Sequence, residues 1–156
     1  MMKKLILWGM LIIPWLSLLF INKHSLKRYM PVGILAALLV TMVFEMGYIF
    51  DWWTVKEKFV PWGEITSFPL TYGVFLIGTI WIFHFTFEKS IWVYFFTNVI
   101  VDAFYAFALL KVLIFFGIYK LENMRHLGIF FLMIIIAVII YIYQKWQDKI
   151  MMPEKK

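Results

Sequence analysis

The sequence IWVYFFTNVIVDAFYAFALLKVLIFF, residues 91–116, decides the fold class of this chain. It is apolar almost throughout and, as a helix, long enough to cross the hydrocarbon core of a bilayer. Asp102 lies near its midpoint, and Asn98 precedes it by one helical turn. A charged side chain at the centre of a membrane costs roughly 2.5–3.5 kcal/mol on insertion scales. Asp102 is therefore the first candidate for a functional residue.

The composition of the whole chain indicates an integral membrane protein. The chain has 156 residues, 64% of them hydrophobic and 21% aromatic, and its mean hydropathy is +0.87. Soluble domains are about 45–50% apolar, and a small domain cannot bury such an excess. The apolar runs are continuous and do not alternate as barrel strands would. We therefore predict an all-α helical bundle that forms a single membrane domain, residues 1–156.

The charges and the absence of cysteine exclude other classes. The 15 Lys+Arg and 9 Asp+Glu residues give a net charge of +6, which we assign to contacts with lipid headgroups and not with nucleic acid. Without cysteine there is no disulfide, thiolate metal site or cysteine nucleophile. The chain has no H-E-x-x-H, G-x-S-x-G or phosphate-binding glycine motif. We expect no cofactor, no metal and no enzymatic activity.

Five apolar runs predict five transmembrane helices, each compared with the ~20 residues that a span needs. The first run is not followed by a small-residue cleavage site, so it reads as a span and not as a cleaved signal peptide. The short connection Glu88-Lys89-Ser90 predicts that the third and fourth spans form an antiparallel hairpin. The predicted spans are residues 5–21, 30–50, 67–87, 91–116 and 127–143.

The connection at residues 51–66 is rich in tryptophan. Trp52, Trp53 and Trp62 are typical of the headgroup level, where the indole ring is buried and its N–H stays hydrated. Pro and Gly residues prevent a continuous helix here. We predict a short interfacial segment that lies on the membrane. The alternative is an aromatic lid over a cavity.

The basic residues near the span ends predict an orientation. With five spans the two termini lie on opposite sides; eight Lys and Arg residues flank the side of the C-terminus and six the other. This favours a cytoplasmic C-terminus in a cell membrane. Five spans do not divide into two inverted halves, so a homodimer could supply such symmetry. The partners that the sequence leaves open are the lipid bilayer, a homo-oligomer and another membrane protein.

Polar residues inside the spans predict a ladder across the membrane. At 1.5 Å rise per residue, His84 and Asn98 fall at one depth, Asp102 near the middle, and Glu45 and Lys111 at the other depth. Spacings of three and four place residues on one helix face. We therefore expect a common polar face that is formed by Asn98, Asp102 and Tyr105.

The second span has small residues at the same spacing. Gly33, Ala37 and Thr41 recur every four residues, and Glu45 continues the series. Small residues let helices approach closely, so this face predicts a helix contact, with Glu45 pointing into the bundle.

Each of these residues has a structural and a functional interpretation. Glu45 and Lys111 could form a structural ion pair, or Lys111 could extend to the interface. Asn98 and Asp102 could form an interhelical hydrogen-bond network. His84 is more typical of a packed or interfacial histidine than of a ligand. The functional hypothesis is a relay for a proton, cation or small polar solute, because buried carboxylates exchange protons near neutral pH. A membrane scaffold or partner-binding subunit is the alternative, ahead of an intramembrane enzyme.

Several stretches resemble a known family. They are SLKRYMPVG and FEMGYIFDWW at the ends of the second span, GTIWIFHFTF in the third, and TNVIVDAFYAF and GIYKL in and after the fourth. Together they resemble small multi-spanning membrane proteins of Gram-positive, spore-forming bacteria. The resemblance implies a helical protein of a bacterial cytoplasmic membrane, and it assigns no active site.

Overall fold

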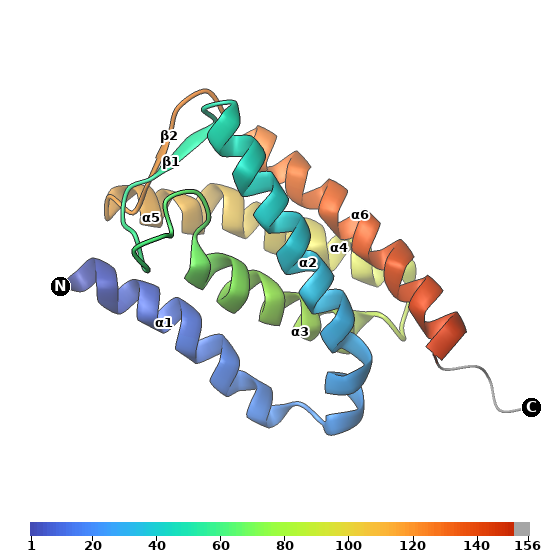
Figure 1. Ribbon diagram of the computed structural model, residues 1–156. Coiled ribbons are helices and arrows are strands. Elements are labelled where there is room, and N and C mark those ends of the chain that lie inside the picture. The colour runs from blue at the N-terminus through green and yellow to red at the C-terminus, as the bar shows by residue number, and fades with distance from the viewer. Residues whose placement is uncertain (152–156) are drawn as a thin grey trace, which may run out of the picture.

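The computed structural model describes residues 1–151 and is built almost entirely of helices (Figure 1). Two short strands, β1 (Trp53–Val55) and β2 (Tyr119–Leu121), are the remaining regular elements of this part of the chain. The predicted all-α bundle is confirmed. Its helical elements are α1 (Met2–Ser17) with the 3-10 turn η1 (Leu18–Phe20), α2 (Lys23–Ile49), the π-helical segment η2 (Leu70–Phe75) with α3 (Leu76–Thr86), α4 (Ile91–Phe104), the π-helical segment η3 (Tyr105–Leu109), α5 (Leu110–Phe115) and α6 (His126–Met151).

The helices match the five predicted spans, with changes at their ends. Among the described residues, four helical stretches are long and apolar enough to cross a membrane: Met2–Phe20, Lys23–Ile49, Ile91–Phe115 and His126–Met151. The fifth, Leu70–Thr86, is apolar but shorter. Two helices extend about two turns beyond the predicted spans: α2 begins at Lys23 instead of residue 30, and α6 continues past residue 143 to Met151.

Side-chain caps explain where two helices start. The Asn22 side chain accepts a hydrogen bond from Ser25 N at 2.8 Å, so α2 begins inside the basic loop that we predicted before it. Ser90 does the same for α4, accepting from Trp92 N at 3.2 Å. The chain therefore turns sharply between α3 and α4, and these helices pack as the predicted antiparallel hairpin.

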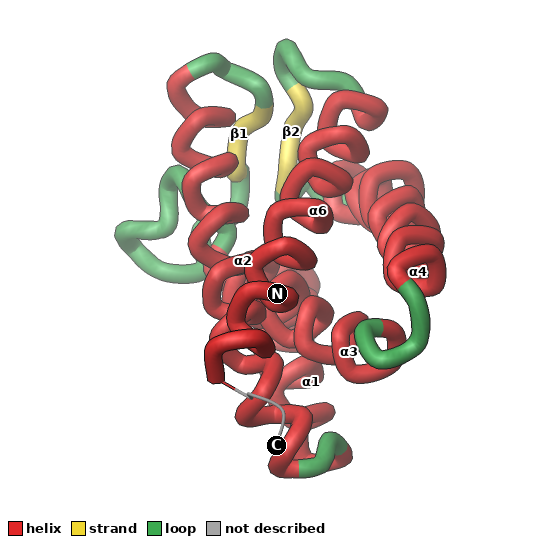
Figure 2. The backbone as a smooth tube through the Cα atoms, turned by 90° about the vertical axis from the view of Figure 1, so that its right-hand side faces the viewer, coloured by secondary structure: helices red, strands yellow, loops and turns green. Residues whose placement is uncertain are grey.

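Four helices form a closed ring, and the fifth lies outside it. Contacts run from α2 to α3, from α3 to α4, from α4 to α6 and from α6 back to α2, and Figure 2 shows these helices in turn around the bundle. α1 packs mainly against η2 (Figure 1). This contact is close, because a Cβ on Gly73 would lie only 2.2 Å from Met10 O.

The predicted small-residue face on α2 is confirmed as a helix contact. Gly33 and Ala37 are buried, and a Cβ on Gly33 would lie 2.9 Å from Ile80 Cγ1 and 3.0 Å from Leu76 O of α3. Thr41 is half-buried; its hydroxyl donates to Ala37 O at 2.9 Å and lies 3.3 Å from the Tyr72 hydroxyl. The absence of a Cβ at residue 33 thus sets the distance between α2 and α3.

Part of segment 51–66 forms a β-ribbon, which we did not predict. β1 pairs antiparallel with β2, with Thr54 opposite Lys120, at the end of the bundle near the N-terminus (Figure 1). Gly117, with φ of 67°, makes the turn that leads into β2, a conformation that glycine adopts freely. Both strands are too short to show an alternating pattern, so their pairing could not be predicted from the residues.

The three predicted interfacial tryptophans have different surroundings. Trp62 is 80% exposed, as expected for a ring at a headgroup layer. Trp52 is half-buried and stacks on Phe50, with ring centroids 5.6 Å apart. Trp53 is half-buried and packs on Gly47 of α2, where a Cβ would meet the ring at 2.6 Å. Of the three tryptophans, Trp53 is the one whose packing against a helix fits the alternative prediction of an aromatic lid.

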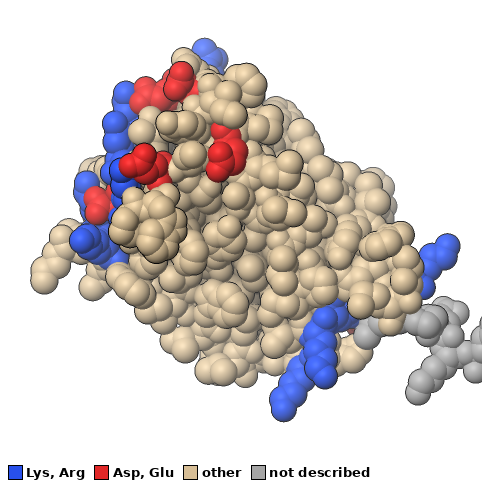
Figure 3. Space-filling view, in the orientation of Figure 1, with Lys and Arg blue, Asp and Glu red and all other residues tan. Residues whose placement is uncertain are grey.

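Charged side chains gather toward the two ends of the molecule. On the face shown in Figure 3, acidic and basic residues lie together at the upper left and basic residues at the lower right. The surface between them is uncharged. Lys155 and Lys156, which contributed to the orientation count, lie outside the described residues. This distribution suits a bundle whose middle faces hydrocarbon.

Candidate functional site

Asp102 lies inside the helical ring with an unsatisfied carboxylate oxygen. Its side chain is 6% exposed. Within residues 1–151, Asp102 Oδ2 is buried and has no hydrogen-bond partner. Buried polar atoms in proteins are nearly always paired, so an unpaired carboxylate oxygen needs an explanation. Asp102 is therefore the centre of the candidate site.

A small cavity adjoins Asp102. Its volume is about 70 Å³, and its walls come from α2, α3, α4 and α6, with Phe75 and Val74 of η2. Besides Asp102, the polar residues of this wall are Asn98 and Thr79. Gly78 also lines the cavity, and a Cβ placed on it would meet nothing within 4 Å. The carboxyl group thus has both a missing partner and free space beside it.

Asn98 shares the buried face with Asp102 but is bonded elsewhere. It is 5% exposed, and its Nδ2 donates to Tyr94 O, four residues earlier on α4, at 2.9 Å. The Tyr94 hydroxyl in turn donates to Ala137 O of α6 at 2.8 Å. The predicted burial of Asn98 and Asp102 on one face of α4 is confirmed, whereas Tyr105, the third residue of that predicted face, lies in η3 and is half-buried. The interhelical network that we considered for Asn98 and Asp102 is not formed in the described part of the chain.

The predicted ladder across the membrane is wrong at its Glu45 and Lys111 end. Both side chains are exposed on the outside of the bundle, and they form no ion pair with each other within residues 1–151. Even in a regular α-helix, nine residues at 3.6 per turn rotate a side chain by about 180°, so a common face for Lys111 and Asp102 was not to be expected from their spacing. In the structure Asp102 is buried and Lys111 is exposed. Lys111 and Asp102 therefore lie on opposite faces of the fourth span.

The error at Glu45 has a related cause. A step of four residues overshoots one helical turn by about 40°, so the series that starts at Gly33 has drifted by about 120° when it reaches Glu45. The structure follows this drift: Gly33 and Ala37 are buried, Thr41 is half-buried and Glu45 is exposed. The prediction that Glu45 points into the bundle was wrong for this reason.

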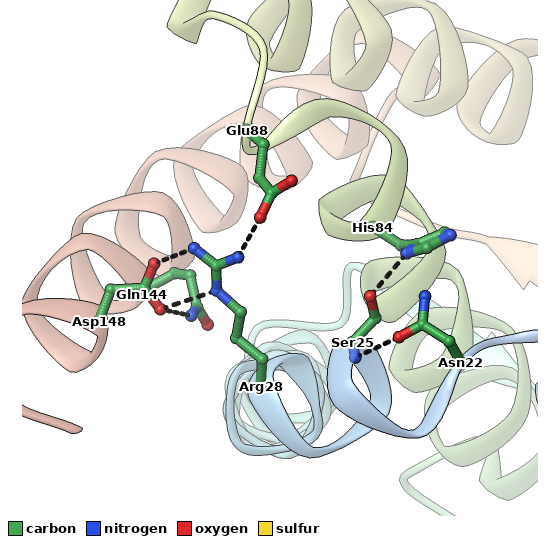
Figure 4. Close-up of polar contacts among 7 residues, drawn as sticks. All are labelled: Asn22, Ser25, Arg28, His84, Glu88, Gln144 and Asp148. Carbon is green, nitrogen blue, oxygen red and sulfur yellow. Dashed lines mark hydrogen bonds and ion pairs between the residues drawn. The ribbon is translucent and has the colours of Figure 1, made fainter. Parts of the chain in front are cut away.

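His84 belongs to the opposite end of the bundle. It is half-buried near the end of α3, and its Nδ1 lies 3.0 Å from Ser25 Oγ of α2 (Figure 4). The Trp81 ring packs edge-on against it, with centroids 5.7 Å apart. His84 thus links α3 to α2 and is not a neighbour of Asp102 in the cavity wall.

Tyr105, predicted on the Asp102 face, lines a second cavity of about 50 Å³. Its ring packs edge-on against Phe75, with centroids 5.1 Å apart. The second cavity is walled almost entirely by apolar and aromatic side chains, among them Trp53 and Tyr119 of the β-ribbon. The ribbon therefore covers this cavity, which supports the lid alternative for Trp53.

The helix that carries Asp102 changes its backbone register directly after the site. α4 ends two residues after Asp102, and in η3 the Leu110 N–H donates to Tyr105 O, five residues back. His126 Nδ1 of α6 donates to Ala106 O within this segment at 2.6 Å. Such π-helical turns are frequent at functional sites. We did not predict His126, because we placed it just before the last span.

A similar contact occurs at the other π-helical segment. Trp15 Nε1 of α1 donates to Tyr72 O within η2 at 3.0 Å. In both segments a ring N–H from a neighbouring helix bonds a backbone carbonyl. The two irregular turns are thus held by tertiary contacts that sequence spacing does not reveal.

A second polar cluster, which we did not predict, lies at the end of the bundle that holds His84. Arg28 contacts Asp148 of α6 through two hydrogen bonds, at 2.6 and 3.2 Å, and also forms an ion pair with Glu88 (Figure 4). Gln144 Nε2 donates to Asp148 Oδ1 at 2.8 Å, and Gln147 Nε2 donates to Arg28 O at 2.9 Å. We missed this Arg28 cluster because we had placed Arg28 in a loop and Asp148 in the tail.

The Arg28 cluster and the Asp102 site are separated by packed aromatic rings. Tyr94 lies between them, with its ring 5.0 Å from Phe83 and 4.7 Å from Tyr141. Phe87 closes the layer next to Arg28, whose guanidinium lies 5.5 Å from the Phe87 ring. The charge of Arg28 is thus engaged at one end of the bundle.

Comparisons of the chain with models of protein families, with curated proteins and with solved structures found no match.

Proposed function

We propose that the chain is a non-enzymatic, multi-pass protein of a bacterial cytoplasmic membrane that binds a small cation, in the simplest case a proton, at Asp102 and passes it across the membrane. The observation that carries this proposal is the unpartnered Oδ2 of buried Asp102 beside a cavity of about 70 Å³. Ionisable residues inside membrane helices are costly, and they commonly mark ion or substrate sites.

Residues 1–151 supply no counter-charge at this site. Arg28 is engaged with Asp148 and Glu88, and Lys111 lies on the outside of the bundle. An ionised carboxylate in apolar surroundings costs several kcal/mol unless it is paired and hydrogen-bonded. The charge of Asp102 therefore has to be neutralised by a proton or by a cation that enters the cavity.

A purely structural role is the competing interpretation. It predicts that Asp102 bonds to another helix, as Tyr94 does to Ala137 O. Asn98 fits a structural role, since its side chain is bonded to its own helix. Asp102 does not, so the two residues that we grouped from the sequence have different roles in this proposal.

The orientation proposed for the chain has its C-terminus in the cytoplasm. The end of the bundle that holds the Arg28 cluster also carries several exposed lysines: Lys23, Lys27, Lys89, Lys145 and Lys149. Cytoplasmic flanks of membrane spans carry such an excess. In this orientation the β-ribbon end, where Lys120 and Glu122 pair, lies on the outer side of the membrane.

The test is a cation-flux measurement in liposomes. Purified protein is reconstituted, a gradient of protons or sodium ions is applied, and the flux of each is recorded. We expect flux with the native protein and at least a tenfold loss in Asp102→Asn, which keeps the shape but removes the charge. Glu45→Gln is the matched control, because Glu45 is an exposed acid, and it should keep native flux. No flux with the native protein, or equal flux in Asp102→Asn, overturns the proposal.

A further inference from the structure

The Asp102 cavity and the cavity beneath the β-ribbon adjoin. They share four wall residues: Val40, Phe75, Met133 and Ile136. One cavity holds the carboxyl group of Asp102, and the other is almost wholly apolar. A ligand that fits both has one charged part and one apolar part.

The apolar cavity is unusually rich in aromatic rings. Phe44, Trp53, Phe75, Tyr105 and Tyr119 all contribute to its wall. Two edge-on pairs organise them: Phe44 with Trp53 at 5.7 Å, and Phe75 with Tyr105 at 5.1 Å between centroids. Aromatic faces attract cations, tryptophan most strongly, and aromatic cages are a common means of binding quaternary ammonium groups.

The site is poorly suited to a bare metal ion. Hard cations such as Mg²⁺ and Ca²⁺ take about six to eight oxygen ligands. The cavity wall supplies the Asp102 carboxyl group, the Thr79 hydroxyl and Asn98, whose amide nitrogen is already committed to Tyr94 O. An organic cation needs no such ligand set, because its charge is spread over alkyl groups that also pack against rings.

The dimensions limit the ligand to a compact molecule. The two cavities measure about 70 and 50 Å³, each enough for several water molecules. Pockets for drug-sized ligands are several times larger, about 300–1,000 Å³. Trp53 Nε1 is buried and has no hydrogen-bond partner in the described part of the chain, so an oxygen atom on the ligand would satisfy it.

From these observations we infer that the ligand of the Asp102 site is a compact organic ammonium ion, with its positive charge near Asp102 and its alkyl groups among the rings around Trp53. This inference rests on the proposed function, since it names the class of cation that the site takes. It gives the β-ribbon a role as the aromatic cover of the binding site.

The test compares a cation with its neutral isostere. Choline, a trimethylammonium alcohol, and 3,3-dimethyl-1-butanol, which replaces its nitrogen with carbon, are measured for binding to the full chain in detergent or nanodiscs. We expect saturable choline binding and at least a tenfold weaker competition by the neutral alcohol. Competition of equal strength overturns the inference, because it shows that the cavity selects shape and not charge.

Variants separate the two parts of the site. Asp102→Asn should abolish choline binding, and Trp53→Leu should weaken it about tenfold, while Trp53→Phe, which keeps a ring, should weaken it less. Trp62→Leu is the matched control from the same segment, because Trp62 is exposed. Size-exclusion and circular dichroism profiles establish that each variant is folded. Native binding by a folded Trp53→Leu variant overturns the aromatic half of the inference.

The outcomes also distinguish this inference from the proposed function. If proton or sodium flux depends on Asp102 but choline does not bind, the inference fails and the proposed function stands. If neither flux nor choline binding depends on Asp102, both fail.

Discussion

The Asp102 site and the Arg28 cluster both place an acidic side chain between helices, but the two acids differ in their hydrogen-bond partners. Asp148 receives hydrogen bonds from Arg28 and Gln144, whereas Asp102 Oδ2 receives none from the described residues. The Arg28 cluster connects α2, α6 and the turn between α3 and α4. The Oδ2 atom of Asp102 makes no hydrogen bond to another helix among the described residues, and Asp102 lines a cavity.

The difference shows how to separate architecture from a binding site in a membrane bundle. A polar group whose bonds are all satisfied by the protein holds the fold together, and it has no capacity left for a ligand. A buried polar group that lacks partners destabilises the fold, so its presence indicates a requirement beyond stability. On this criterion the paired charges of Arg28, Asp148 and Glu88 are architecture, although the side-chain oxygens of Gln144 and Gln147 beside them are also buried without a partner among the described residues. Asp102, whose own charged group lacks the partner, is the binding site that we propose.

The most direct test of this distinction is to remove each charge in turn and to measure the free energy of unfolding. Arg28→Met leaves Asp148 and Glu88 without their cation, so we expect a loss of about 3 kcal/mol in the free energy of unfolding. Asp102→Asn should cause no loss. Unfolding in mixed micelles, followed by circular dichroism, measures both. A similar loss in the two variants would remove the distinction between the two regions.

Arg28→Lys tests the geometry of the cluster. Lysine keeps the charge but lacks the planar fork that makes two bonds to Asp148. We expect a loss smaller than in Arg28→Met but still measurable in the same assay.

A second comparison concerns free space. At Gly33 an added Cβ would clash with Ile80 and Leu76 O, so we expect Gly33→Ala to cost about 1–3 kcal/mol through overpacking. At Gly78, which lines the Asp102 cavity, an added Cβ meets nothing within 4 Å. Gly78→Ala should therefore keep native stability but reduce choline binding. Equal destabilisation in both variants would show that the cavity is not free.

The smallest effect is expected at the exposed ion pair of the β-ribbon. Lys120 Nζ donates to Glu122 at 2.8 Å, and this hydrogen bond lowers the pKa of Glu122. The ionised form is favoured in the folded state, so its stabilisation is present above the ordinary glutamate pKa. It is lost as pH falls through the lowered folded-state value.

The measurement is the difference in Tm between the native protein and Glu122→Gln as a function of pH. We expect a small difference at neutral pH that disappears in acid, because exposed pairs contribute little. A difference as large as that of Arg28→Met would show that exposure does not separate the two ion pairs.

Much of the fold could be predicted because it depends on local patterns. Apolar runs of sufficient length predicted the helices, and the Gly33–Ala37 spacing predicted a close helix contact, which the structure shows to be made with α3. Asn98 and Asp102 were placed correctly on a buried face, because one step of four residues drifts by only about 40°. The errors at Glu45 and Lys111 arose over longer separations.

The rest depends on contacts between distant segments. The pairing of β1 with β2 joins residues far apart in the chain, and no period of two marks either strand. Arg28 and Asp148 are 120 residues apart. The missing partner of Asp102 could not be predicted either, since it is a property of the assembled bundle and not of any spacing along one helix.

The position of α1 outside the helical ring has a consequence for assembly. Its docking surface consists of η2 and α3, where Trp15 bonds to Tyr72 O and Trp81 bonds to Ser17 Oγ at 2.8 Å. Synthesis delivers α1 to the membrane before η2 and α3, so its docking surface exists only after the third span has been inserted. In a two-stage view of membrane folding, helices insert before they associate. Helix α1 therefore remains in the lipid until then, and the order in which the helices associate does not follow the order of the sequence.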